Sequence, residues 1–246
     1  MSDVICTLQG DFYLLGCKHD TDKTTYHGYH RFYPRFVEHL RGRDEMAMIE
    51  IGMDQLKSLN LWLEYFPRAF IYGVDIGVEM TGERFSIHKA DQSDIPALQV
   101  LADRIRAAHR QVAFINDDGS HVPAHVIASF NYLFQHVLED GGVYAIEDIE
   151  TSYWKHGALY GYRVECGLHH RGSVVEIFKR LADDVNQQYL SAHEQRLQSV
   201  LVSQIPDEVR AMVSSVSFAQ NCIIITKKTA EERAYDGRPY KWPQFL

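Results

Sequence analysis

Apolar runs and amphipathic segments alternate along most of this chain. Short runs rich in β-branched and aromatic residues predict strands at residues 46–51, 69–74, 85–88, 112–115 and 142–146. Segments with apolar residues at helical spacing separate these runs, at residues 56–65, 95–110 and 122–137. Each segment is long enough for a crossover helix, so the pattern predicts an α/β fold in which helices cover both faces of a mostly parallel sheet.

The last part of the chain departs from this alternation. Apolar residues recur at helical spacing over residues 173–190, which predicts an amphipathic helix that packs on the sheet or on a second subunit. Residues 213–218 and 222–226 predict two strands joined at Ala219-Gln220-Asn221, an antiparallel C-terminal edge. With this hairpin the predicted sheet has seven strands. Asp140-Gly141-Gly142 predicts a turn between a helix and the next strand.

Length and composition favour a single domain. The chain has 246 residues, of which 46% are hydrophobic and 24% charged, which is ordinary globular usage. Within the domain we expect an N-terminal helical segment or lid over residues 1–45 and a helical insertion over residues 156–210. The tail, residues 233–246, is rich in aromatic residues and is expected to dock on the body or on a partner.

Charge and hydropathy exclude several classes of partner. The apolar runs are too short to cross a bilayer, and the N-terminus lacks a basic and then apolar leader, so we expect a cytoplasmic protein without a membrane partner. A net charge of −8 without a basic stripe argues against nucleic acid. The four cysteines form no CxxC pair, which argues against a disulfide framework or a thiolate zinc site.

An acidic residue lies at the carboxyl end of each of the first five predicted strands. A single one of these acids is readily explained as a turn former or helix cap. Because ligands of open parallel sheets bind beyond the carboxyl ends of the strands, acids clustered there indicate a bound cation or hydroxyl donors. The acids are Glu50, Asp75, Asp91, the pair Asp117-Asp118 and the pair Glu147-Asp148.

The first two strand ends indicate which cofactor this edge binds. Asp75 follows the second strand, where an acid accepts hydrogen bonds from the hydroxyls of a ribose. The first loop, residues 52–58, contains a single glycine, whereas a pyrophosphate needs close backbone approach through several glycines. A dinucleotide is therefore disfavoured, and S-adenosylmethionine, which carries no phosphate, remains compatible.

The fourth and fifth strand ends predict a metal site. Asp118, Glu147 and Asp148 offer oxygen ligands with no cysteine nearby, which suits Mg²⁺ or else Mn²⁺. His121 follows on the same turn and could remove the proton of a substrate hydroxyl held by the metal. A zinc pair formed by His121 and His125 is the alternative, but Pro123 between them and the surrounding carboxylates argue against it.

With these residues identified, the chain resembles the metal-dependent sugar O-methyltransferases of antibiotic biosynthesis. The resemblance covers most of residues 20 to 226, and its two most specific motifs are residues 117–121 and 146–154. Its other motifs are Asp22-Lys23, residues 27–29 with Tyr33, and residues 49–52, 58–59, 62–67, 72–76 and 91–94. In one respect the chain departs from this family: its first loop contains fewer glycines.

The resemblance implies a Rossmann-like class I methyltransferase fold, homo-oligomers and the same metal ligands, with His121 as the general base. It also implies S-adenosylmethionine as the cofactor, with contacts at Glu50, Gly52, Ser58, Asp75, Ile76, Asp91, Gln92 and Asp117. Aromatic faces that could contact a sugar are offered by His27, Tyr29, Tyr153 and Trp154.

The resulting hypothesis is methylation of a sugar hydroxyl on a glycosylated natural product or saccharide, dependent on S-adenosylmethionine and Mg²⁺. A catechol or an amine with two chelating atoms is an alternative acceptor. A metal-dependent hydrolase that uses the same acids to activate water is a second alternative, and a non-catalytic binding protein a third.

Overall fold

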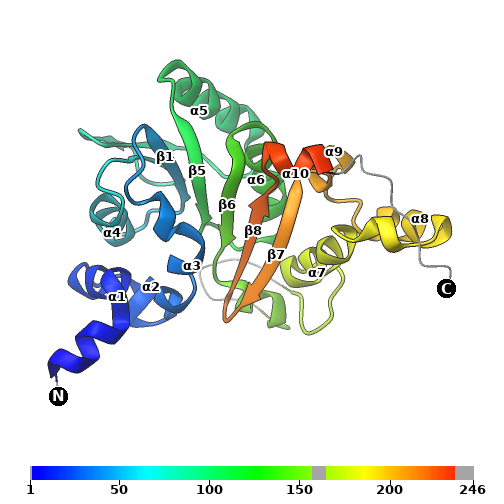
Figure 1. Cartoon of the computed structure of the whole chain (residues 1–246), viewed down its shortest axis with the longest axis horizontal. Helices are drawn as coiled ribbons and strands as arrows, with labels where there is room; N and C mark the ends of the chain where they lie inside the picture. Colours follow the sequence, from blue (N-terminus) through cyan, green and yellow to red (C-terminus); the bar gives the residue numbers. More distant parts are fainter. Residues whose placement is uncertain (1, 157–164, 236–246) are drawn as a thin grey trace.

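The computed structural model describes residues 2–156 and 165–235, with side chains from residue 10 onward. Its strands form one sheet of eight in the order β3-β4-β2-β1-β5-β6-β8-β7. In this order, Figure 1 labels the strands of the sheet from β1 to β7. The strands are β1 Met46–Ile51, β2 Phe70–Asp75, β3 Met80–Thr81, β4 Phe85–Lys89, β5 Gln111–Asp117, β6 Leu138–Ile146, β7 Val213–Ala219 and β8 Cys222–Lys227.

The pairing confirms a parallel sheet with an antiparallel C-terminal edge. Strands β4, β2, β1, β5 and β6 are parallel neighbours, whereas β8 runs antiparallel to β6 and β7 antiparallel to β8. The count of seven strands was one too low, because β3 adds an antiparallel edge next to β4. This strand has two exposed residues, so no alternation of apolar and polar residues marked it.

Helices pack on both faces of the sheet. The α-helices are α1 Ser2–Lys18, which is interrupted at Gly10, α2 Asp22–Thr25, α3 Pro34–Val37, α4 Lys57–Tyr65, α5 Ile95–Ala107, α6 Pro123–His136, α7 Val174–Asp184, α8 Ala192–Leu201, α9 Asp207–Arg210 and α10 Ala230–Tyr235. The 3₁₀ helices are η1 Tyr29–Arg31, η2 Glu38–Leu40, η3 Ile149–Tyr153 and η5 Gln187–Tyr189.

Two buried apolar clusters lie on opposite faces, because successive side chains of a strand point to opposite sides. On β1, Ala47 and Ile49 belong to one cluster with side chains from α5, α6 and α7. Met46 and Met48 belong to the other, with side chains from α1, α3 and α4. Figure 1 shows α1 and α4 on one side of the molecule and α7 on the other.

Several predicted boundaries were wrong. Strand β6 begins at residue 138, so Asp140-Gly141-Gly142 lies inside it rather than in a turn. Gly141, with φ of 75°, accommodates an irregularity there, and the pairing of β5 with β6 shifts register between Val112 and Phe114. Helix α5 ends at Ala107, two residues before His109 takes up φ of 52°.

The region after η3 contains α7, η5, α8 and α9. Residues 173–190, predicted as one helix, form α7 and the short η5. Of the two predicted packing partners for α7, the sheet side is the observed one: Phe178 lies edge-on against Phe130 of α6, with ring centroids 4.9 Å apart. Most of the aromatic tail, residues 236–246, lies outside the described residues. Within the described part of the chain, no helix is both long and apolar enough to cross a membrane.

Candidate active site

A cavity of about 770 Å³ opens at the carboxyl ends of the parallel strands, between the loops that follow them and the segment Asp20–Thr25. Its size is typical of small-molecule sites. The predicted cofactor, metal and base residues on its wall are Gly52, Ser58, Asp75, Ile76, Asp91, Gln92, Asp118, His121 and Asp148, and His125 of the zinc alternative also lines it.

Gly52 allows the loops after β1 and β5 to touch. Its φ is 84°, and a Cβ at this position would lie 2.0 Å from the carbonyl oxygen of Asp118. Only glycine tolerates both conditions. The amide of Asp118 in turn donates to the carbonyl oxygen of Ile51 at 2.9 Å.

Asp75 holds two loops at the end of β2. Its Oδ2 accepts a hydrogen bond from the amide of Met53 at 2.9 Å, and its Oδ1 accepts from the amides of Gly77 and Val78 at 2.7 and 2.9 Å. The carboxylate therefore lies at the cavity wall in a fixed orientation. Its role as a ribose ligand stays a prediction.

Asp117 lies behind the cavity wall and accepts a hydrogen bond from Gln92, which is part of that wall. The side chain is buried and accepts hydrogen bonds from Ser129 at 2.9 Å, Tyr144 at 3.0 Å and Gln92 at 3.1 Å. Burial raises the pKa of this carboxyl, and the three donors oppose the rise. Because Gln92 Oε1 also accepts from the amide of Ser120 at 2.6 Å, the buried acid is linked to the loop that carries the base candidate.

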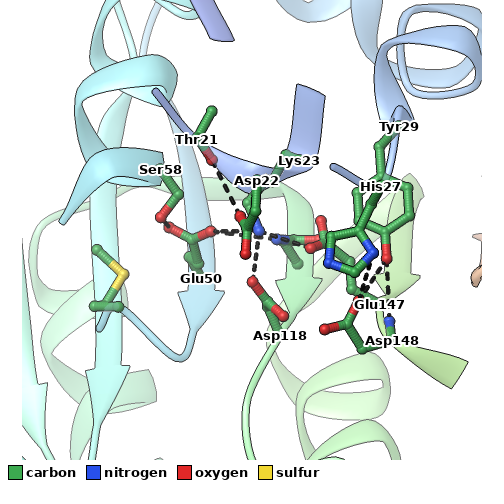
Figure 2. Close-up of polar contacts among 12 residues, drawn as sticks. Thr21, Asp22, Lys23, His27, Tyr29, Glu50, Ser58, Asp118, Glu147 and Asp148 are labelled. Carbon is green, nitrogen blue, oxygen red and sulfur yellow. Dashed lines mark hydrogen bonds and ion pairs between the residues drawn. The ribbon is translucent and has the colours of Figure 1, made fainter. Parts of the chain in front are cut away.

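Three carboxylates surround the ammonium group of Lys23, which is fully buried. Its Nζ donates to Asp118 Oδ2 and to Glu147 Oε2, each at 2.7 Å, and lies 3.3 Å from Glu50 Oε1 (Figure 2). Burial alone would lower the pKa of the lysine, but the three acids raise it well above its ordinary value. Lys23 is therefore a permanent cation within the acidic site.

Lys23 was not among the predicted site residues. Hydrophobic periodicity identifies apolar core residues, so it does not identify a buried lysine. Lysines are also almost never fully buried unless paired. The available signal was its place in the Asp22-Lys23 motif of the resemblance.

Glu147 and Glu50 lie beneath the cavity wall. Glu147 Oε2 accepts from Lys23, and its Oε1 accepts a short hydrogen bond from the hydroxyl of Tyr33. Glu50 accepts from Ser58 at 2.8 Å. Burial raises the pKa of both acids, well above the ordinary value for Glu147, while Lys23 opposes the rise. The assignments of Glu147 as a metal ligand and of Glu50 as a cofactor contact stay predictions.

Asp148 faces the cavity at the end of β6. Its Oδ2 lies 3.9 Å from Nε2 of His121. Together with Asp118, these residues offer one ligand atom each, all within 4.8 Å of one another, so they could hold a metal ion. Burial raises the pKa of Asp148, and the neighbouring charge of Asp118 adds to the rise. A cation would relieve that repulsion.

The remaining predicted residues lie around this cluster. The rings of His27 and Tyr29 stack behind Asp148, with centroids 5.2 Å apart, and Tyr29 donates to its Oδ1. Tyr153 and Trp154 lie at the end of η3. None of these four candidate substrate contacts is among the described residues of the cavity wall. His125 is 3.1 Å from Ser120 Oγ and outside the metal-binding cluster of described residues, so the structure gives the zinc alternative no support.

Comparisons with known proteins relate this site to methyltransferases. No protein-family model matches the sequence. The 8-demethyl-8-alpha-L-rhamnosyl tetracenomycin-C 2'-O-methyltransferase of Streptomyces olivaceus is 37% identical over 149 residues, 57% of this chain and 38% of that protein. The L-olivosyl-oleandolide 3-O-methyltransferase of Streptomyces antibioticus is 36% identical over 183 residues, 70% of this chain and 45% of that protein.

The mycinamicin VI 2''-O-methyltransferase of Micromonospora griseorubida is 34% identical over 178 residues, 68% of this chain and 42% of that protein. The matches thus span less than half of the length of these relatives.

Solved structures relate the fold of this chain to methyltransferases as well. The MycE methyltransferase of the mycinamycin biosynthetic pathway, in complex with Mg, SAH and mycinamycin VI, superposes with a TM-score of 0.71 at 26% identity over 95% of this chain and 58% of that chain. A second crystal form of MycE, with Mg and SAH, superposes with a TM-score of 0.76 at 27% identity, over 97% of this chain and 58% of that chain. The chain is therefore homologous to sugar O-methyltransferases of antibiotic pathways and has the class I methyltransferase fold that its sequence predicted.

Proposed function

We propose that this chain methylates a hydroxyl group of a sugar, on a glycosylated natural product or saccharide, with S-adenosylmethionine and Mg²⁺. The observation that carries the proposal is the cluster of Asp118, His121 and Asp148 at the edge of a cavity large enough for a small-molecule ligand. The names of the relatives, and the Mg and SAH bound in MycE, support the same chemistry.

The donor sets fit both groups. Asp118 and Asp148 offer hard oxygen ligands of the kind that Mg²⁺ prefers, and Glu147 shares the ammonium group of Lys23 with Asp118. Asp75, Asp91 and the loop at Gly52 line the part of the cavity where we place S-adenosylmethionine. When bound, S-adenosylmethionine supplies the methyl group, and Mg²⁺ supplies positive charge that holds and acidifies a hydroxyl.

His121 is the proposed general base, so the proposal assigns the metal to the carboxylates and not to its imidazole. Its imidazole lines the cavity and lies beside Asp148, where it can accept the proton that the acceptor hydroxyl loses. The buried ammonium of Lys23 orients Asp118, Glu50 and Glu147, and it opposes the rise in pKa that burial causes in the two glutamates. The loops joined at Gly52 position the two substrates, and positioning alone can lower a barrier by about 7 kcal/mol or more.

The test is a methyl-transfer assay with the purified chain. S-adenosylmethionine is incubated with rhamnosyl and other deoxysugar glycosides, and with catechol and amine acceptors, before and after treatment with EDTA. We expect SAH to form with a sugar acceptor, formation to stop with EDTA and to return with MgCl₂. Three results would contradict the proposal: turnover that EDTA does not change, a preference for catechols or amines, or hydrolysis of an ester without S-adenosylmethionine.

Assembly, organisation and location remain proposals from the sequence. We propose a homo-oligomer of a single methyltransferase domain in the cytoplasm, with residues 1–45 as an N-terminal helical segment or lid and residues 156–210 as a helical insertion. The net charge of −8 supports the absence of a nucleic-acid partner.

A further inference from the structure

The tip of the β7–β8 hairpin reaches the edge of the cluster. Ala219 and Cys222 pair in the hairpin register, so Gln220 and Asn221 form the turn. Asn221 has φ of 60°, in the left-handed region that asparagine tolerates better than most residues. Turn geometry therefore accounts for the backbone of Asn221, but its side chain makes contacts that the turn does not require.

The amide of Asn221 has one possible orientation. Its Oδ1 accepts a hydrogen bond from the backbone N–H of Glu150 at 2.9 Å. Because a backbone N–H can only donate, the other end of the amide must be the NH₂ group. That group lies 3.0 Å from Asp148 Oδ1 and 3.0 Å from His27 Nδ1.

A second donor converges on the same oxygen. The hydroxyl of Tyr29 donates to Asp148 Oδ1 at 2.7 Å, and Asn221 Nδ2 lies 3.2 Å from that hydroxyl. The other oxygen of the carboxylate, Oδ2, is the one that lies 3.9 Å from His121 Nε2. One oxygen of Asp148 is thus held from behind, which directs the other toward the cluster.

We propose that Asn221 is a positioning residue that presents Asp148 Oδ2 to the metal ion. The inference rests on the proposed function, because it takes Asp148 as a metal ligand. Groups that orient metal ligands typically contribute about 10- to 100-fold to metal affinity. Asn221 is contributed by the hairpin at the C-terminal edge of the sheet, so it couples that edge to the site.

The test uses Asn221→Gly, because glycine favours the same φ and removes only the side chain. Wild type and variant are saturated with SAH and titrated with MgCl₂ by calorimetry. We expect the Kd for Mg²⁺ to rise by about tenfold or more, while the affinity for SAH stays at the wild-type level. The matched control is Gln220→Ala in the same turn, whose side chain accepts from Arg31 and should leave the Kd for Mg²⁺ unchanged.

A double-variant cycle separates positioning from general damage. Tyr29→Phe removes the other donor to Asp148 Oδ1 and should also weaken Mg²⁺ binding. Since both donors act through one oxygen, their effects on Mg²⁺ binding should not be independent. The increase in the Kd for Mg²⁺ in the double variant should therefore differ from the product of the increases in the two single variants. A wild-type Kd in Asn221→Gly overturns the inference alone, whereas a wild-type chain that binds no Mg²⁺ overturns the proposed function as well.

Discussion

At the scale of single residues, Lys23 determines whether the acids of the site can be buried together. Its ammonium group has three protons, and three carboxylates contact it, those of Glu50, Asp118 and Glu147. Isolated carboxylates at such depth would be strongly unfavourable, because burial penalises their charged form. The lysine therefore stabilises the site before any metal arrives.

Replacing Lys23 by Met should lower the free energy of unfolding by about 3 kcal/mol or more, because removing one partner leaves the buried charges of the other uncompensated. Urea unfolding in EDTA measures this change. The control is Lys18→Met: Lys18 forms an exposed ion pair with Glu64, and its loss should cost no more than about 1 kcal/mol. Equal effects of the two variants would show that the buried ammonium has no special role.

His121 carries the prediction on catalysis. His121→Ala should reduce turnover by about 10² or more, because it removes the proposed general base. Its affinity for SAH, measured by calorimetry, should remain that of the wild type. His39→Ala, an exposed histidine on η2, is the control and should retain full turnover. Full turnover in His121→Ala would refute the assignment of the base.

Residues at the strand ends could be predicted, whereas residues that reach the site from elsewhere could not. Strand periodicity located Asp75, Asp118 and Asp148 near one edge, and the structure brings all three to the cavity wall. Lys23 and Asn221 come from a short helix and a hairpin turn. Their sequence neighbourhoods predict local structure only, because Asp118 and Glu147 lie 95 and 124 positions from Lys23, and Asp148 lies 73 positions from Asn221.

At the scale of elements, the loops after β1 and β5 lie so close together that Gly52 cannot be replaced by a larger residue without a cost in stability. Gly52→Ala should destabilise the chain by about 2 kcal/mol or more, because it adds a left-handed backbone penalty to a collision with a carbonyl oxygen. It should also weaken SAH binding, since the cavity wall must shift. Gly42→Ala, where a Cβ meets nothing within 4 Å, is the control. Thermal unfolding and calorimetry distinguish the two variants, and a neutral Gly52→Ala would contradict the described contact.

The elements were predicted best where burial imposes a regular period. Strands β1, β2 and β5 are almost completely buried, and their apolar runs were recognised within a few residues of their ends. The exposed β3 has no such run, and the glycines of β6 were read as a turn because a bulge and a turn use the same residues. Boundaries therefore failed where tertiary pairing, rather than local pattern, continued or ended an element.

At the scale of the whole molecule, metal binding and stability should be coupled. Mg²⁺ at about 100 times its Kd should add about 2.7 kcal/mol to the free energy of unfolding. For a chain of this size, that corresponds to a rise of roughly 5 to 10 °C in thermal midpoint. Differential scanning calorimetry with MgCl₂ and with EDTA measures the rise. An unchanged midpoint at saturating Mg²⁺ would contradict a site in the folded chain.

The same coupling predicts a pH dependence. Burial raises the pKa of Glu147 and Asp148 in the folded chain, so the folded state binds more protons than the unfolded state at intermediate pH. Without metal, stability should therefore fall as the pH rises through these raised values. Mg²⁺ binds the ionised acids, so its stabilising effect should grow over the same range. Thermal midpoints with and without MgCl₂ across a pH series test this, and curves that stay parallel would count against it.

The position of Lys23 on a segment outside the sheet also affects when the site is completed during folding. Lys23 is 95 positions from Asp118 and 124 from Glu147, so these contacts close long loops and are expected to form late. A chain that has built its sheet but has not yet docked this segment contains the acids without their internal counter-ion. Under the proposed function, catalytic activity therefore reports completed folding, because the segment that docks late supplies the internal counter-ion of acids proposed to hold the metal.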